Sequence, residues 1–121
     1  MDGSRPLFVQ ISEIIENDII SGVYQTDDLI ISTTQISKVY SVNPATDVRA
    51  VSRLSDSGVL YKKRGIGMCV AAGAKEKIKE RRREVFLDKT VGELLFEAEL
   101  LGIGLNELID VIKSKEEEKS L

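Results

Sequence analysis

Residues 42–70 decide the fold of this chain and read VNPATDVRAVSRLSDSGVLYKKRGIGMCV. Asn43 is the predicted N-cap of a helix, and Pro44 takes the first helical position, where its missing N–H costs nothing. Gly58 is the predicted end of that helix. Two short β-prone runs follow, joined by a basic, glycine-bearing loop that favours a hairpin. A helix followed at once by such a hairpin is the DNA-reading half of a winged helix, so the first hypothesis is a gene regulator.

The sequence before this stretch predicts two further helices. Apolar residues recur at three- and four-residue spacing over residues 7–21, as in an amphipathic helix. A short helix is expected over residues 33–40 with Ser32 as its cap, and a short strand is expected at residues 29–31. About three residues then lead into the helix that begins at Pro44. Two helices joined by so short a turn form a helix-turn-helix, whose second helix enters the major groove.

Side-chain spacing divides the helix after Pro44 into two faces. Val48, Val51 and Leu54 are spaced to face the core. The remaining polar positions, which are Thr46, Asp47, Arg49 and Arg53, are expected to face solvent or a ligand. Ala45 is small enough to touch a thymine methyl group, Thr46 is placed to reach a phosphate or a base, and Arg49 is placed to read guanine or grip phosphate. The alternative is that this face is merely solvated.

The hairpin loop carries three cations and two glycines: Lys62, Lys63, Arg64, Gly65 and Gly67. Glycine permits positive φ and lets the backbone approach another molecule closely. Such a tip suits insertion along a minor groove or against phosphates. The alternative is an ordinary basic hairpin that is solvated on both sides.

The charge distribution favours a nucleic-acid partner more than the formal net charge of −3 does. Residues 32–64 hold six basic and two acidic side chains, and residues 65–83 hold six basic and two acidic side chains. A phosphate backbone contacts a local basic surface, so the charge of that surface matters more than the net charge of the whole chain. The basic run at residues 75–83 either adds phosphate contacts or is the solvated face of a long helix.

Composition limits the other classes of function. The 121 residues suit one domain, or one small domain with an appendage, and 42% are hydrophobic and 31% charged, as in a soluble globular protein. No membrane span or secretory signal is expected, and the single cysteine fits a reducing cytoplasm. The absence of histidine removes the commonest general base and metal ligand, so we expect no enzyme, no metal and no cofactor.

The last part of the chain is predicted to be helical and to form an interface. A long helix is expected over residues 75–101, with a possible kink near residues 88–92, and a final helix over residues 105–115. Residues 116–121 are expected to fray. An exposed apolar stripe usually marks an interface, and here a twofold dimer is predicted. Its residues are Val85, Val91, Leu94, Leu95, Ala98, Leu101, Leu105, Leu108, Ile109 and Ile112. The alternative is that the stripe covers the winged helix of the same chain.

Residues 43–70, together with the opening residues 5–11 and 20–24, resemble the DNA-binding domain of GntR-family bacterial regulators. With only about 50 helical residues after the hairpin, the chain is most similar to the small YtrA-type branch. The resemblance implies a homodimer that represses or modulates transcription, often of transporter operons. It also implies DNA contacts, which carried over are Ser32, Thr33, Thr34, Thr46, Arg49, Arg64, Gly65 and Gly67. Thr34 stands where the family usually has arginine, which predicts weaker binding or an altered operator.

The predicted fold is mainly α-helical with a small β-hairpin: a winged helix-turn-helix domain at residues 1–73, followed by a two-helix dimerisation segment at residues 74–121. The predicted function is a sequence-specific DNA-binding regulator, a repressor that acts as a homodimer on a palindromic operator. The rival hypothesis is a winged-helix protein-interaction module that does not bind DNA. The operator, the regulated genes and any small-molecule effector are not specified by the sequence.

Overall fold

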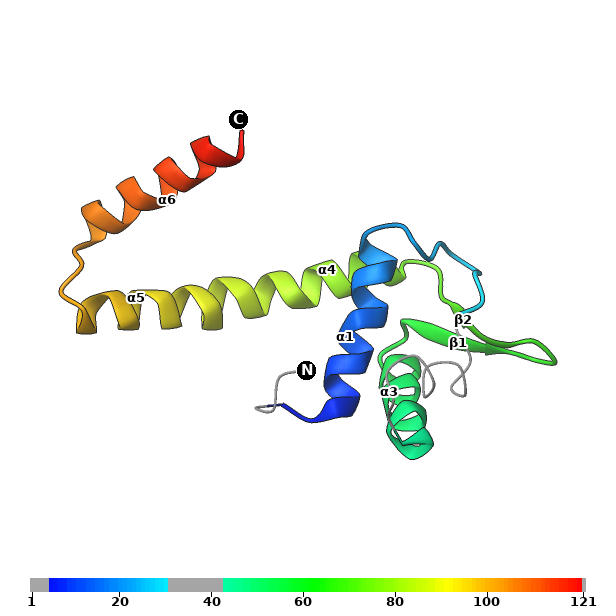
Figure 1. Cartoon of the computed structure of the whole chain (residues 1–121). Coiled ribbons are helices and arrows are strands. Elements are labelled where there is room, and N and C mark those ends of the chain that lie inside the picture. The colour runs from blue at the N-terminus through cyan, green and yellow to red at the C-terminus, as the bar shows by residue number, and fades with distance from the viewer. Residues whose placement is uncertain (1–4, 31–42, 121) are drawn as a thin grey trace. The chain divides into compact units, whose positions relative to one another are not determined.

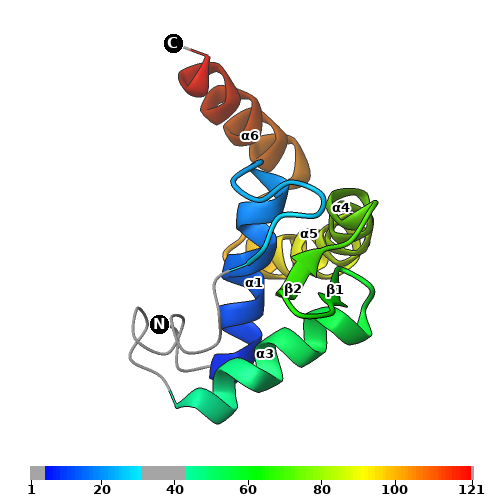
Figure 2. The same ribbon diagram turned by 90° about the vertical axis from the view of Figure 1, so that its right-hand side faces the viewer.

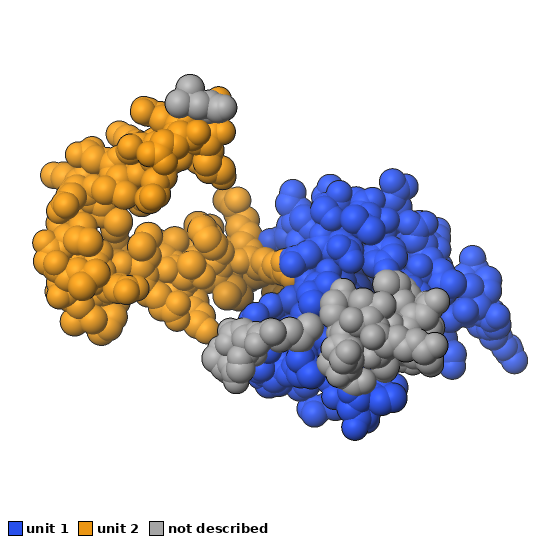
Figure 3. Space-filling model, viewed as in Figure 1, with its two compact units in different colours: residues 1–80 blue, residues 81–121 orange. Residues whose placement is uncertain are grey.

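The computed structural model describes residues 5–30 and 43–120, and it divides into two compact units, Met1–Glu80 and Arg81–Leu121 (Figure 3). We call the first the winged-helix unit and the second the C-terminal unit. The predicted helix at residues 33–40 and its cap Ser32 lie outside the described residues. In chain order the described elements are α1 (Leu7–Ile20), α3 (Pro44–Asp56), β1 (Leu60–Lys63), β2 (Gly67–Val70), α4 (Ala74–Val85), η1 (Phe86–Thr90), α5 (Val91–Leu100) and α6 (Leu105–Lys119) (Figure 1).

Helices α1 and α3 pack side by side and supply half of the buried core residues of the winged-helix unit (Figure 2). Helix α1 begins after Pro6, and Gly22, with a φ of 87°, turns the chain beyond its end, as expected. The core contains residues from α1, α3, both strands, the start of α4 and two connecting segments: Ile11, Ile15, Ile19, Ile30, Ala50, Val51, Leu54, Val59, Leu60, Val70, Ala74 and Ile78. The first turns of α4 therefore belong to the winged-helix unit.

The buried face of α3 differs from the predicted one. Its buried residues are Asp47, Ala50, Val51 and Leu54, whereas Val48 is 56% exposed. The prediction was wrong for Val48, which was expected in the core, and for Asp47, which was expected in solvent. Positions i, i+3, i+4 and i+7 form one stripe on a helix, so burying Asp47 and Leu54 together turns Val48 outward. An acidic residue in the first turn is also favoured by the helix dipole.

The hairpin is confirmed, and its strands reach closer to the tip than the β-prone runs predicted at residues 59–61 and 68–70. Strands β1 and β2 are antiparallel, with Leu60 paired to Val70 and Lys63 to Gly67. Leu29 forms an isolated bridge to Cys69 where the short strand at residues 29–31 was expected. Backbone hydrogen bonds from Ile30 N–H to the Met68 carbonyl and from Val70 N–H to the Asp28 carbonyl join this segment to β2, at 3.0 Å each. At the root of the hairpin, β2 is therefore hydrogen-bonded along both of its edges, to β1 on one side and to residues 28–30 on the other.

The C-terminal helices are regular except for one π-helical turn. The chain is helical from Ala74 to Leu100 without a break, and the π turn Phe86–Thr90 lies close to the predicted kink at residues 88–92. After Gly102, with a φ of 73°, helix α6 diverges from α5 instead of packing along it (Figure 1). Helix α6 continues to Lys119, so the expectation that residues 116–119 fray was wrong. No described helix is long and apolar enough to cross a membrane.

Candidate nucleic-acid interface

The start of α3 is fixed by the side chain of Asn43. Its Oδ1 accepts a hydrogen bond from Ala45 N–H at 2.9 Å, and its carbonyl accepts one from Thr46 N–H at 2.9 Å. Asn43 and Pro44 therefore act as cap and first helical residue, as predicted. Ala45 is left exposed and Thr46 half-buried at the N-terminal end of the helix, which is the end that meets base edges in a helix-turn-helix.

Arg49, one turn later, lies against α1. Its guanidinium carbon is 4.1 Å from the centroid of the Phe8 ring, a cation–π arrangement. Arg49 is exposed and Phe8 is half-buried on the edge of the core. The cation is therefore held beside α1 and stays accessible from outside.

Arg53 is engaged inside the winged-helix unit. Its Nη1 donates a 2.6 Å hydrogen bond to Ser12 Oγ, and that hydroxyl donates to the Val9 carbonyl at 2.7 Å. Ser12 is fully buried. The sequence left Arg53 for solvent or a ligand, but its half-buried guanidinium joins α3 to α1.

The tip of the hairpin is a tight turn that displays its cations. The Ile66 N–H donates to the Lys63 carbonyl at 3.0 Å, and Gly65 in the turn has a φ of 80°. Glycine is favoured there because other residues rarely adopt positive φ. Lys62, Lys63, Arg64, Gly65 and Ile66 are all exposed. A turn of this kind presents the backbone and the cations together.

Gly67 has a packing role at the base of this turn. Its φ is 134°, and a Cβ at this position would lie 3.1 Å from Leu29 Cδ1. A side chain here would be strained and would push Leu29 away. Gly67 thus lets the segment before residue 31 close onto the hairpin.

A hydrogen bond ties the hairpin to the loop after α1. Tyr61 Oη donates to Asp27 Oδ1 at 2.7 Å, and the Asp27 N–H donates to the Val70 carbonyl at 2.8 Å. The carboxylate accepts from the neutral phenol and repels its anion, and together with slight desolvation this raises the pKa of Tyr61 to about 12. Asp27 holds a φ of 71°, a left-handed conformation that aspartate and asparagine tolerate better than most residues.

The predicted DNA-contact residues fall into three groups. Ser32, Thr33 and Thr34 lie outside the described residues. A second group lies on α3, and a third on the hairpin tip: Ala45, Thr46 and Arg49, then Lys63, Arg64, Gly65 and Gly67. That these residues contact DNA stays a prediction.

Sequence reasoning missed three exposed residues beside these groups. Val48 and Ser52 share the outer face of α3 with Ala45, and Ile66 at the hairpin tip is 56% exposed. Ala50 is apolar and lies four positions before Leu54, and this helical spacing is the sequence signal that could have placed Val48 outside.

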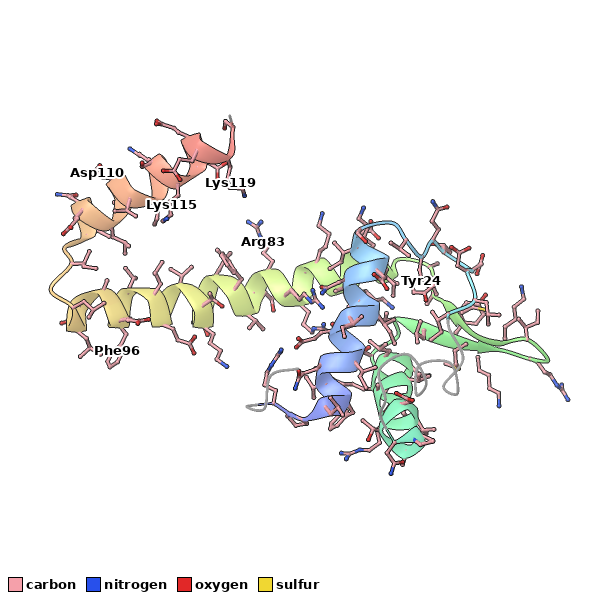
Figure 4. All side chains as sticks on the ribbon, in the orientation of Figure 1. Tyr24, Arg83, Phe96, Asp110, Lys115 and Lys119 are labelled. Atoms are coloured by element: carbon pink, nitrogen blue, oxygen red, sulfur yellow. The ribbon has the colours of Figure 1, made fainter. Side chains whose placement is uncertain are left out.

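The predicted interface residues of the C-terminal unit are mostly exposed. Ala98 is buried, Val91 and Leu108 are half-buried, and the other seven are exposed: Val85, Leu94, Leu95, Leu101, Leu105, Ile109 and Ile112. Further exposed apolar residues that the sequence did not single out are Phe86, Leu87, Phe96, Leu100 and Val111. In Figure 4 the labelled Phe96 points from α5 to the side away from α6, so α5 is apolar on two sides.

Comparison with known proteins finds likeness among solved structures. A transcriptional regulator of the GntR family from Bacteroides thetaiotaomicron is 33% identical, with a TM-score of 0.78, over 93% of this chain and 99% of that one. A GntR-family regulator from Listeria monocytogenes is 26% identical, with a TM-score of 0.76, over 94% and 98%. YtrA from Sulfolobus acidocaldarius shares the fold at 18% identity and a TM-score of 0.56, over 100% and 97%. Scans of family models and of curated proteins found no match.

The chain belongs to the GntR family of winged-helix transcriptional regulators. The family resemblance seen in the sequence and the predicted fold class are confirmed. The similar structures are regulators and not enzymes, as expected for this chain. Among the described residues, no group of histidine, cysteine, aspartate and glutamate side chains is arranged to hold a metal ion.

Proposed function

We propose that this regulator is a homodimeric repressor that binds a palindromic operator in a sequence-specific way. The observation that carries the proposal is the exposed outer face of α3 in the same unit as a basic hairpin tip. Helix α3 shows Ala45 and Val48 outward, and the tip shows Lys63 and Arg64. This combination suits base contacts from a helix in the major groove, and phosphate or minor-groove contacts from the hairpin.

The anchored root of the hairpin supports its role as a wing. The hydrogen bond between Tyr61 and Asp27 and the pairing of residues 27–30 with β2 fix the two strands to the body of the unit. A rigid support holds the cations of the tip at a defined distance from α3.

The homodimer is proposed from the apolar surface of the C-terminal unit. Leu94, Leu95, Leu105, Ile109 and Ile112 are between 37% and 62% exposed. Helices α5 and α6 diverge, and most of their apolar residues stay exposed. A second copy that packs its own helices there would bury both stripes, and a twofold arrangement would present two α3 helices to two half-sites.

One fold relative supports the DNA partner. The regulator BusR from S. agalactiae, 23% identical with a TM-score of 0.58 and matched over half of its own chain, was solved in complex with its busA promoter DNA. The shared fold supports the same mode of binding here, and the repressor role rests on the family resemblance alone.

Fluorescence anisotropy with promoter fragments from the protein's own locus tests the proposal. We expect specific binding whose affinity falls with salt, with a log–log slope of about −0.9 for each neutralised phosphate. Arg64→Gln should reduce that slope by about two units, one for each protomer, whereas Lys113→Gln on α6 should not change it. Binding to no fragment, or binding that does not depend on salt, would favour the rival hypothesis of a protein-interaction module.

A further inference from the structure

The outer face of α3 has an apolar centre. Val48 is 56% exposed, and Ala45 and Ser52, one turn to either side, are exposed too. Residues at i, i+3 and i+7 lie on one side of a helix. The opposite side, with Ala50, Val51 and Leu54, is buried and fixes the rotation of the helix. The middle of the face that points out of the unit therefore offers methyl groups and one hydroxyl group, but no cation.

The cations that α3 itself carries lie at the edge of this face. Within the described part of α3 the cations are Arg49 and Arg53. Arg49 lies over the Phe8 ring at 4.1 Å and Arg53 donates to the buried Ser12. Both guanidinium groups thus reach toward α1. A helix in the major groove lies between the two phosphate backbones that border the groove, so a cation held at the side of α3, away from its outer face, is placed for phosphate rather than for a base.

We propose that Val48 is a specificity-determining residue that recognises the C5 methyl group of a thymine in the major groove, and that Arg49, held by Phe8, contacts a backbone phosphate. This inference rests on the DNA binding proposed above. Thymine is the one natural base that presents a methyl group in the major groove. A valine side chain on the groove-facing side of α3 can neither donate nor accept a hydrogen bond. It therefore stabilises the complex only where it buries apolar surface.

Because Val48 is exposed, a substitution there can test base preference without disturbing the fold. Valine has a lower helix propensity than alanine, and an exposed side chain adds little to the core. Val48→Ala should therefore leave folding unchanged, so a loss of base preference can be assigned to the missing contact. Val23→Ala is the matched control, because Val23 is 66% exposed in the loop after α1.

The experiment begins with selection of an operator from a random pool of duplex DNA by the full-length protein. Each thymine of the selected operator is then replaced by deoxyuridine, which removes only the methyl group. For the wild type and Val23→Ala, we expect about a fourfold loss of affinity at one thymine of each half-site, the effect of one buried methyl group. For Val48→Ala, deoxyuridine at that position should change nothing further.

Arg49→Ala completes the test. It should weaken binding to all sequences alike and reduce the salt slope by about two units, one for each protomer of the dimer, with the thymine effect retained. A change of base preference in Arg49→Ala would overturn the phosphate assignment. A thymine effect that persists in Val48→Ala, or no effect at any thymine, would overturn the role of Val48 and leave DNA binding intact. Selection of no duplex at all would overturn the proposed function itself, and this inference with it.

Discussion

Tyr61 on β1 and Asp27 in the loop after α1 are joined by a 2.7 Å hydrogen bond, although 34 positions separate them in the sequence. The bond spans the root of the wing. The pKa of Tyr61 is raised above its ordinary value of 10.0 to about 12. A raised pKa means that the bond stabilises the fold at every pH below about 10, and that this contribution is lost as the pH rises through about 12.

Asp27→Asn should lower the pKa of Tyr61 toward 10, because the amide lacks the negative charge that repels the phenolate. Asparagine also tolerates the positive φ of Asp27, so the loop should keep its conformation. NMR titration of ring-labelled tyrosine measures this shift, with Tyr24 as the internal control. An unchanged titration of Tyr61 in Asp27→Asn would show that the hydrogen bond does not form in solution.

The cap at Asn43 gives a prediction for stability. Asn43→Ala removes the acceptor for Ala45 N–H and should lower the free energy of unfolding by about 1 kcal/mol. Asn43→Ser should keep most of the stability, since serine is an equally good cap. Urea unfolding followed by circular dichroism measures both variants. Equal losses in the two variants would indicate that the asparagine acts by something other than capping.

The hydrogen bond between Arg53 and Ser12 predicts a coupling between α3 and α1. Ser12→Ala and Arg53→Met should each destabilise the protein by about 1 kcal/mol. The double variant should lose less than the sum, because the second change removes a bond that is already absent. Urea unfolding of the four proteins gives the coupling energy. If the losses in the free energy of unfolding were strictly additive, Arg53 would not interact with Ser12 and would be a solvent-exposed cation, as the sequence suggested.

The proposed dimer can be tested by single charges on its surface. Leu95→Lys and Ile109→Lys place a cation where the second copy should pack, so both should shift the protein toward the monomer mass of 13.4 kDa. Light scattering after size-exclusion chromatography measures the mass. Asn106→Lys, on α6 with Ile109 but outside the predicted stripe, is the control.

Phe96→Lys separates the two apolar sides of α5. Because Phe96 points away from α6, this variant should remain dimeric if the predicted stripe is the interface. Dissociation by Phe96→Lys, with Leu95→Lys still dimeric, would move the interface to the opposite side of the helix.

Local signals in the sequence predicted most of the fold. The cap Asn43, the first-turn Pro44 and the terminal glycines each act within a few residues, so the ends of α1 and α3 and the hairpin were found. The rotation of α3 was not found. Asp47 is polar yet buried, and Val48 is apolar yet exposed, so hydrophobicity points the wrong way at two adjacent positions.

The contacts that link distant parts of the chain were equally hidden. Phe8 beside Arg49 and Asp27 beside Tyr61 depend on how α1 and its loop pack against later elements. Nothing in the local sequence specifies such pairs. The π turn Phe86–Thr90 was anticipated only as a weak point, because Gly92 lowers helix propensity nearby.

The exposed helices of the C-terminal unit also have a thermodynamic consequence. In the described residues 81–120, Ala98 is the only buried side chain, so a lone chain has almost no core to hold α5 and α6 in place. If a second copy supplies that core, folding of this unit and association become one equilibrium, and its stability rises with protein concentration. The cellular level of the regulator would then set both how much of it is folded and how much can occupy an operator.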